Sequence, residues 1–290
     1  MPTPHDSQPG KGQDMGSNPN IGASQIPETF MEFLTGRPAY ELANAPVAGW
    51  IAAMITAGIV ISAQFLAIVV VFGYGWLRGS PSLAQGRYGA PPDGGLVKAV
   101  ANIPAADLML LTLISQIAVV ALTLGAATRW GGVASLRLAP PAGGWRLYAH
   151  AFGAMLPILA VVNGLAYLVA PIEMLSDFKF FQGLAREKNI AVTALAIGAG
   201  APLSEELLFR GFLLTAMSAT ALGYWRAAII ATMGWTALHF AYSWVGLTEV
   251  FCIGLYLSWL LWRTGSLLPP LFCHALYNSS LLVALRFWPQ

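Results

Sequence analysis

The stretch "VAGWIAAMITAGIVISAQFLAIVVVF" (residues 47–72) contains no Asp, Glu, Lys or Arg. A hydrocarbon core about 30 Å thick is crossed by roughly 20 consecutive apolar residues in a helix, so this stretch is long enough to span a membrane. Its apolar residues form one continuous block, whereas a half-buried strand would alternate them with polar residues. The stretch therefore predicts a transmembrane helix.

The composition of the whole chain agrees with this prediction. Of the 290 residues, 57% are hydrophobic and 10% are charged. A soluble domain carries about 25% charged residues, so this chain has too few to cover a water-facing surface. The net charge of +2 and the lack of a basic patch argue against nucleic acid as a partner. Cys252 and Cys273 lie in apolar runs without CxxC spacing, which indicates small buried side chains and not a disulfide framework.

Similar apolar blocks recur along the chain, and we expect an all-α, polytopic membrane protein with about seven transmembrane helices. The expected spans are residues 47–73, 107–128, 148–170, 190–217, 226–243, 247–263 and 267–287. The fourth span contains "GAGAP" (198–202), which would raise the count to eight if it breaks the helix. The fifth and sixth spans are short and close together, as in a helical hairpin.

The chain divides into four parts by composition. The first is polar and lacks the apolar core of a signal peptide, so we expect a disordered tail that ends in a short surface helix at "PETFMEFL", from Pro27. A Gly- and Pro-rich loop is expected at 74–106, and an amphipathic helix on the membrane interface precedes the fourth span. The four parts are residues 1–46, 47–170, 171–189 and 190–287.

Three charged residues interrupt the fourth span in "SEELLFRGFLL" (204–214). An ionisable side chain at the bilayer centre costs roughly 2.5–3.5 kcal/mol on insertion scales, so these residues should face the bundle interior or a wet cavity. On a helix Glu206 and Arg210 lie about 40° apart, whereas Glu205 and Arg210 lie about 140° apart. The spacing pairs Arg210 with Glu206 and leaves Glu205 without a local cation. An unpaired buried carboxylate is expected to have a raised pKa, as a general base requires.

The following spans carry further polar groups. His239 lies about midway to two-thirds along the fifth span, and His274 and Asn278 share one face of the seventh, a turn apart. Each residue alone has a structural explanation, such as a hydrogen bond between helices. Together with Glu205 they would supply a base, a second proton carrier or ligand, and donors for an oxyanion. The remaining polar residues in or near spans are interpreted as packing or interfacial contacts, among them Gln116, Asn163 and Glu249.

At these residues the sequence resembles the CAAX protease and bacteriocin-processing (CPBP, or Abi) family of intramembrane proteases. The family motif EExxxR is present as "EELLFR" (205–210) and HxxxN as "HALYN" (274–278). The motif FxxxH is present as "WTALH" (235–239), with Trp235 in place of Phe. The resemblance covers residues 190–287 and leaves the first three spans without a counterpart.

The resemblance implies hydrolysis of a peptide bond within the membrane. In that family the first Glu and the first His of the motifs activate a water, and the last His and Asn stabilise the oxyanion. On this chain those residues are Glu205, His239, His274 and Asn278. The second Glu and the Arg of EExxxR are implied to support the site, here Glu206 and Arg210.

The resemblance leaves metal dependence open, because the family has been described both as metalloproteases and as glutamate-dependent proteases. Glu205, His239 and His274 would bind Zn²⁺ with one open position for water, the pattern of catalytic zinc. The chain has no HExxH motif, and the three residues come from three helices, so the sequence does not fix the geometry of such a site.

The expected partners are a peptide or protein substrate at the membrane and the lipid bilayer, and the expected location is a bacterial cytoplasmic membrane. Two other functions are open at this point. One is a non-proteolytic membrane protein for binding or immunity, in which the polar cluster is a specificity clamp. The other is a proton-coupled transporter, since buried Glu and His residues can relay protons, although no second broken helix suggests a repeat.

Overall fold

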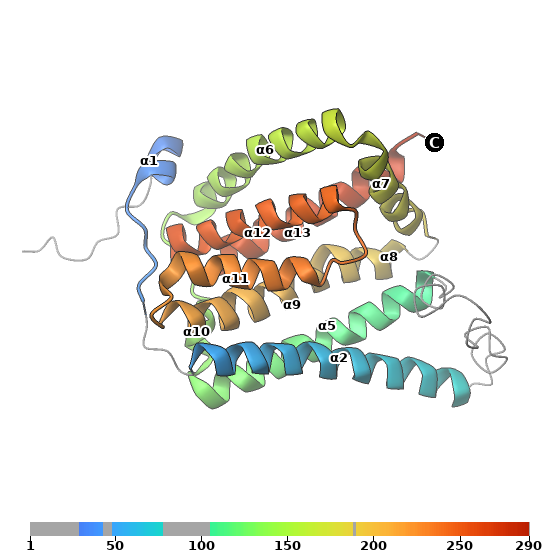
Figure 1. The fold of residues 1–290 in the computed structure, drawn as a ribbon, viewed down its shortest axis with the longest axis horizontal. Helices are drawn as coiled ribbons and strands as arrows, with labels where there is room; N and C mark the ends of the chain where they lie inside the picture. Colours follow the sequence, from blue (N-terminus) through green and yellow to red (C-terminus); the bar gives the residue numbers. More distant parts are fainter. Residues whose placement is uncertain (1–28, 43–47, 78–104, 188–189, 290) are drawn as a thin grey trace, which may run out of the picture.

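The computed structural model describes residues 29–42, 48–77, 105–187 and 190–289, and every regular element in these ranges is a helix (Figure 1). The all-α prediction is confirmed. Much of the expected tail, residues 1–28 and 43–46, lies outside the described residues, as does the centre of the expected loop, 78–104.

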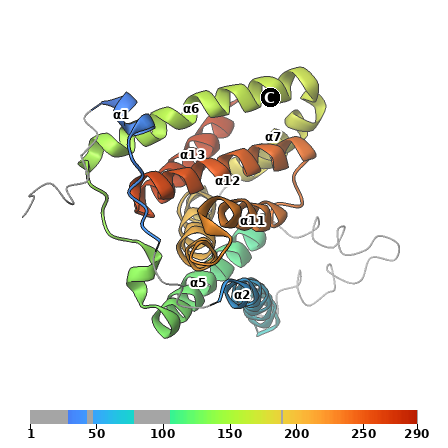
Figure 2. The same cartoon turned by 60° about the vertical axis from the view of Figure 1, so that its left-hand side comes forward.

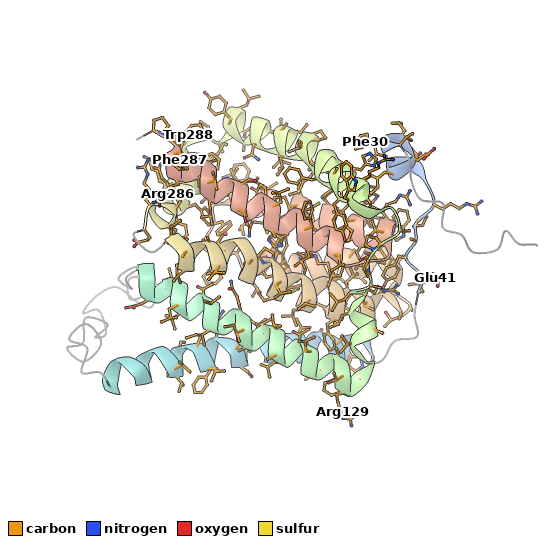
Figure 3. The ribbon with its side chains drawn as sticks, turned by 180° about the vertical axis from the view of Figure 1, so that it is seen from behind. Phe30, Glu41, Arg129, Arg286, Phe287 and Trp288 are labelled. Atoms are coloured by element: carbon orange, nitrogen blue, oxygen red, sulfur yellow. The ribbon has the colours of Figure 1, made fainter. Side chains whose placement is uncertain are left out.

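Six helical runs in the described part of the chain are long and apolar enough to cross a membrane. They are α2 (Gly49–Leu77), α5 (Ala105–Trp130), α6 (Gly144–Val169), the run Ile190–Ser218, α12 (Trp244–Thr264) and α13 (Leu268–Phe287). Charged residues lie near their ends. Figure 3 shows Arg129 with Glu41 at one end of the bundle, and Arg286 with Trp288 at the other.

The expected count of seven or eight spans is not confirmed. The fifth expected span, 226–243, corresponds to α11 (Gly223–Ala237), which has 15 residues. At 1.5 Å per residue this helix is ~22 Å long, too short to cross a hydrocarbon core of about 30 Å. The chain turns at residues 238–242 and begins α12 at Trp244.

The charged span is one continuous helical run, so "GAGAP" does not divide it. The run consists of α8 (Ile190–Thr193), the π-helix η2 (Ala194–Gly200), α9 (Ala201–Glu205), a second π-helix η3 (Glu206–Leu214) and α10 (Thr215–Ser218). Pro202 cannot donate a backbone hydrogen bond, and the wider π-helical turn before it lets the helix continue past this residue.

The charged run lies at the centre of the bundle. In Figures 1 and 2, α2 and α5 lie side by side on one side of it, and α11, α12, α13 and α6 lie on the other. Burial follows this arrangement: 56% of the apolar window of α12 and 50% of that of Ile190–Ser218 are buried, against 17% for α6. The helices at the centre are packed against protein, while α6 and α2 present apolar side chains outward, as lipid contact requires.

The short helix expected from Pro27 onward is confirmed as α1 (Phe30–Thr35). Thr29 and Glu32 form a capping box at its start, which satisfies two free backbone N–H groups. Phe33 is fully buried, and the Arg263 guanidinium of α12 donates 2.6 Å to its carbonyl and 2.7 Å to that of Glu32. For residues 29–42, the expected disordered tail is therefore replaced by a packed segment.

The helix expected before the charged span is α7 (Pro171–Ala185). Pro171 occupies its first turn, where the missing N–H has no helical partner in any case. Figure 1 shows α7 at the same end of the bundle as the C-terminus, and it packs against α13 and α12. This placement puts α7 beside the cavity described next.

Candidate active site

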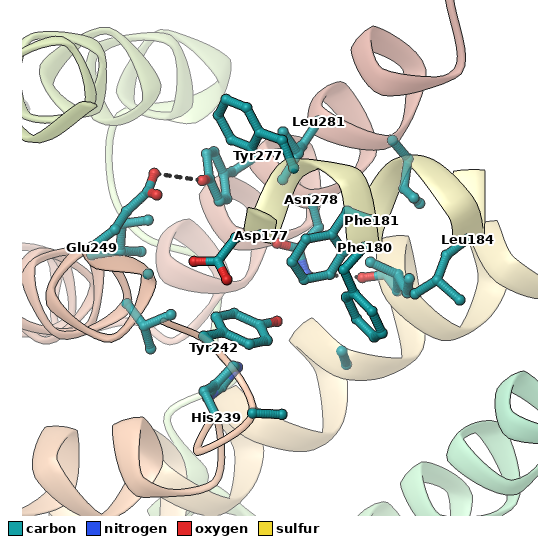
Figure 4. Close-up of a pocket in the computed structure, with 18 of the residues that line it drawn as sticks. Asp177, Phe180, Phe181, Leu184, His239, Tyr242, Glu249, Tyr277, Asn278 and Leu281 are labelled. Atoms are coloured by element: carbon teal, nitrogen blue, oxygen red, sulfur yellow. Dashed lines mark hydrogen bonds between the residues drawn. The ribbon is translucent and has the colours of Figure 1, made fainter. Parts of the chain in front are cut away.

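A cavity of about 430 Å³ lies between α7, α9, α12, α13 and the turn after α11 (Figure 4). Most of its lining is apolar, with Phe and Leu side chains from α7 on one side. The four residues implied to be catalytic all line it: Glu205, His239, His274 and Asn278. The three motifs, which are up to 73 positions apart in the sequence, therefore meet in one hollow.

Glu206 and Arg210 lie behind the cavity, and both are fully buried. Glu206 Oε1 and an Arg210 terminal nitrogen are 3.0 Å apart, which is the pairing that the helical spacing predicts. The same oxygen accepts a 2.9 Å hydrogen bond from Nδ1 of His274 on α13. Arg210 also donates 3.2 Å to the carbonyl of Gly254 on α12. The pair thus joins η3 to two neighbouring helices.

Glu205 is the carboxylate that faces the cavity, and 23% of its side chain is exposed. Its Oε2 accepts a 2.6 Å hydrogen bond from the indole N–H of Trp235, and Nε2 of His274 is 3.9 Å from the same oxygen. Oε1 has no hydrogen-bond partner among the described residues. Sequence spacing did not reveal the Trp235 contact, because it joins two helices and 30 positions of sequence.

The sequence predicts His239 inside the fifth span, but the structure has it in the turn that follows α11. The helix ends at Ala237, and the backbone N–H of His239 closes a turn onto Thr236 at 2.9 Å. Its Nδ1 is 3.0 Å from the carbonyl oxygen of Trp235. A carbonyl can only accept, so Nδ1 carries the proton and Nε2 of the neutral ring has a free lone pair.

Asn278 donates 2.9 Å from Nδ2 to the carbonyl of Ile197 in η2. In the i→i+5 pattern of a π-helix that carbonyl would be paired with residue 202, and Pro202 has no N–H to give. Gln116 of α5, interpreted from sequence as a packing residue, donates 2.9 Å to the adjacent carbonyl of Ala196. Two amide side chains therefore donate hydrogen bonds to backbone carbonyls of the π-helical turn that precedes the first motif.

The cavity also holds a second carboxylate that the motifs do not include. Glu249 Oε1 accepts a hydrogen bond from Tyr277 at 2.7 Å (Figure 4) and another from Asn163 at 2.9 Å. The interfacial position expected for Glu249 is replaced by a place in the cavity wall. Glu249 and Tyr277 lie on successive spans, so no short interval in the sequence could predict their contact.

Asp177 connects α7 to the opposite wall. Its two carboxylate oxygens accept hydrogen bonds from the backbone N–H of Ser243 at 3.0 Å and from the hydroxyl at 2.6 Å. The preceding residue, Tyr242, faces the cavity, and burial together with the nearby Glu205 and Asp177 carboxylates raises the pKa of its phenol. Tyr242 therefore stays protonated near neutral pH and can donate a hydrogen bond into the cavity.

No group of three His, Cys, Asp or Glu side chains in the described part of the chain is arranged to hold a metal ion. His274 uses Nδ1 for Glu206, and His239 uses Nδ1 for a backbone carbonyl. Glu205, His239 and His274 share the cavity wall, and the Nδ1 contacts of both rings leave Nε2 as the nitrogen that would bind a metal ion.

Comparisons with known proteins agree with the motif analysis. Residues 187–280 match a family described as type II CAAX prenyl endopeptidase Rce1-like. An uncharacterised 24.3 kDa protein of Escherichia coli is 34% identical over 121 residues, which are 40% of this chain and 56% of that protein. This chain therefore spans about half the length of that curated relative, and no solved structure matches.

The matched region begins just before α8, ends within α13 and contains the three motifs and every cavity residue that they supply. The chain is an integral, multi-pass membrane protein. Its residues 187–280 are similar to the Rce1-like family of CAAX-type intramembrane proteases, which agrees with the resemblance drawn from its motifs.

Proposed function

We propose that this protein is an intramembrane endopeptidase that hydrolyses a peptide bond near the membrane surface. The observation that carries the proposal is that Glu205, His239, His274 and Asn278, from three motifs, line one cavity. Side chains of α7 line the cavity, and Figure 1 shows α7 at the end of the bundle where the C-terminus lies, which supports a cleavage position away from the bilayer centre. The family match supports the reaction class.

Glu205 and His239 activate the attacking water. Oε1 of Glu205 and Nε2 of His239 are both acceptors, so a water between them can donate a hydrogen bond to each and point a lone pair into the cavity. As the water oxygen bonds to the carbonyl carbon, one proton passes to Glu205. That proton then moves to the amide nitrogen, the C–N bond breaks, and a carboxylic acid and an amine leave.

His274 and Asn278 stabilise the oxyanion that forms when water attacks. Asn278 has two amide N–H groups, and only one is needed for Ile197. His274 donates from Nδ1 to Glu206, so a second donation from Nε2 requires the imidazolium. Two carboxylates lie beside this ring, Glu206 at Nδ1 and Glu205 at Nε2.

A metal-dependent form of this reaction would place Zn²⁺ on Glu205, His239 and His274, and it requires these side chains to move together. Two measurements separate the forms: cleavage after dialysis against a chelator, and the metal content of the purified protein. Full cleavage by metal-free protein supports the water activation described above. Loss of cleavage that added Zn²⁺ restores supports the metal-dependent form.

Glu205→Gln tests the proposal directly. Purified protein in lipid nanodiscs is offered a library of quenched fluorescent peptides, and we expect the variant to lose cleavage while its level and membrane insertion stay unchanged. Glu173→Gln makes the same change on α7 outside the cavity and should cleave normally. Full cleavage by Glu205→Gln would exclude the mechanism.

A non-proteolytic binding or immunity protein is the second candidate function. The observation in its favour is that His274 and Asn278 already make hydrogen bonds to Glu206 and Ile197, as structural ties would. Under that function Asn278→Ala lowers stability but keeps the biological phenotype wherever the protein folds. Under the protease function the folded variant loses cleavage.

Cell fractionation tests the proposed location, a bacterial cytoplasmic membrane.

A further inference from the structure

Trp235 stands where the family motif FxxxH has Phe, and it is only 2% exposed. Its indole N–H donates to Oε2 of Glu205 over 2.6 Å. The indole nitrogen is a donor only, and a hydrogen bond to an ionised carboxylate is roughly twice as strong as one between neutral groups. A phenyl ring at this position would have no donor for Glu205.

The indole ring is fixed by contacts on several sides. The Arg210 guanidinium lies over the ring with its central carbon 4.2 Å from the centroid, and the rings of His239 and His274 meet it edge-on at 5.1 and 5.5 Å. Gly254 leaves the space that the ring needs, because a Cβ there would lie 2.9 Å from Cε3 of Trp235. The N–H of a ring held this way has one direction in which to donate.

We infer that Trp235 is a positioning residue that anchors one oxygen of Glu205 and leaves the other to act as the base. The inference rests on the proposed function of Glu205. Oε2 is held by Trp235 and lies beside His274, whereas Oε1 has no partner among the described residues and is the oxygen that takes a proton from water.

The other charged and polar groups near Glu205 belong to residues that Trp235→Phe does not alter. Glu206 and Arg210 lie on the same helical run, His274 faces Glu205 from α13, and His239 and Tyr242 come from the turn before α12. A fall in the kcat of this variant is therefore attributable to the lost N–H.

The test is Trp235→Phe, which keeps an aromatic ring and removes the donor. With a fluorescent peptide that the wild-type protein cleaves, we expect kcat to fall about tenfold or more while KM stays within about twofold. Trp262→Phe on α12, outside the cavity, is the matched control and should change neither quantity.

An unchanged kcat in Trp235→Phe, with Glu205→Gln inactive, would overturn the inference and leave the proposed function standing. Activity in both variants would remove the proposed function as well. If Trp235→Phe does not fold, benzothienylalanine at position 235 replaces the N–H with sulfur in a ring of the same shape. The same fall in kcat at an unchanged KM is then expected, and its absence counts against the anchor.

Discussion

Glu205 and Glu206 are neighbours in the chain, yet they belong to two different environments on one helical run. Glu206 is fully buried and bonded to Arg210 and His274. Glu205 is partly exposed to the cavity, keeps one oxygen without a partner among the described residues, and has its other oxygen bonded to Trp235 and 3.9 Å from His274. A single step along the helix separates the fully buried carboxylate from the one proposed to act as the base.

The difference separates the proposed base from the buried ion pair that supports it. On the sealed side, Glu206, Arg210 and the Gly254 carbonyl offset part of the cost of buried charge with an ion pair and hydrogen bonds, while Glu206 Oε2 and Arg210 Nε have no hydrogen-bond partner among the described residues. The cavity side is free to leave acceptors open, since water can satisfy them. Mutations on the sealed side should therefore change stability first, and mutations on the cavity side should change activity first.

The largest expected effect on stability comes from Arg210→Ala, which tests the sealed side. It removes the cation beside the buried Glu206 and also the support over Trp235, and breaking a buried ion pair typically costs about 3–5 kcal/mol. Unfolding of the protein in detergent micelles measures this loss. Arg226→Ala, on the exposed face of α11, should cost far less. Equal stabilities for the two variants would contradict the division into two sides.

A smaller effect is expected when the space at Gly254 is filled. In Gly254→Ala the added Cβ would lie 2.6 Å from Cγ2 of Thr232 and 2.9 Å from an Arg210 nitrogen, so neighbours must move at a typical cost of about 1–3 kcal/mol. Gly153→Ala on α6 meets nothing within 4 Å and should gain about 0.5–1 kcal/mol, because Ala favours a helix more than Gly. Thermal unfolding of the two variants gives the comparison, and a stabilised Gly254→Ala would show that the packing there is loose.

The sequence was sufficient for features that depend on local spacing. The apolar blocks predicted the helical membrane fold, and the four-residue interval predicted the contact between Glu206 and Arg210. Both follow from helical geometry and from the length needed to cross a bilayer, which act over a few turns. The motifs also identified the region that the family match covers.

Features that depend on contacts between distant segments could not be predicted in this way. The bond from Trp235 to Glu205 joins α11 to α9, and the ties from Arg263 hold a stretch whose composition alone suggested disorder. The length of α11 was overestimated, because apolar residues continue after Ala237 although the helix does not. Hydropathy measures how apolar a segment is. It does not predict where an apolar segment packed within the protein ends its helix and turns.

The smallest expected effect concerns the tie between α7 and the cavity wall. Ser243 accepts a 3.2 Å hydrogen bond from the N–H of Gly246 as the N-cap of α12 and donates to Asp177 of α7. Ser243→Ala removes both bonds and should lower the free energy of unfolding by about 1 kcal/mol. Asp177→Asn keeps the cap and weakens only the tie to α7, so it should cost less. Hydrogen exchange should be faster along α7 in both variants, and along the first turn of α12 only in Ser243→Ala. Protection of α7 that neither variant changes would show that its apolar contacts alone hold it over the cavity.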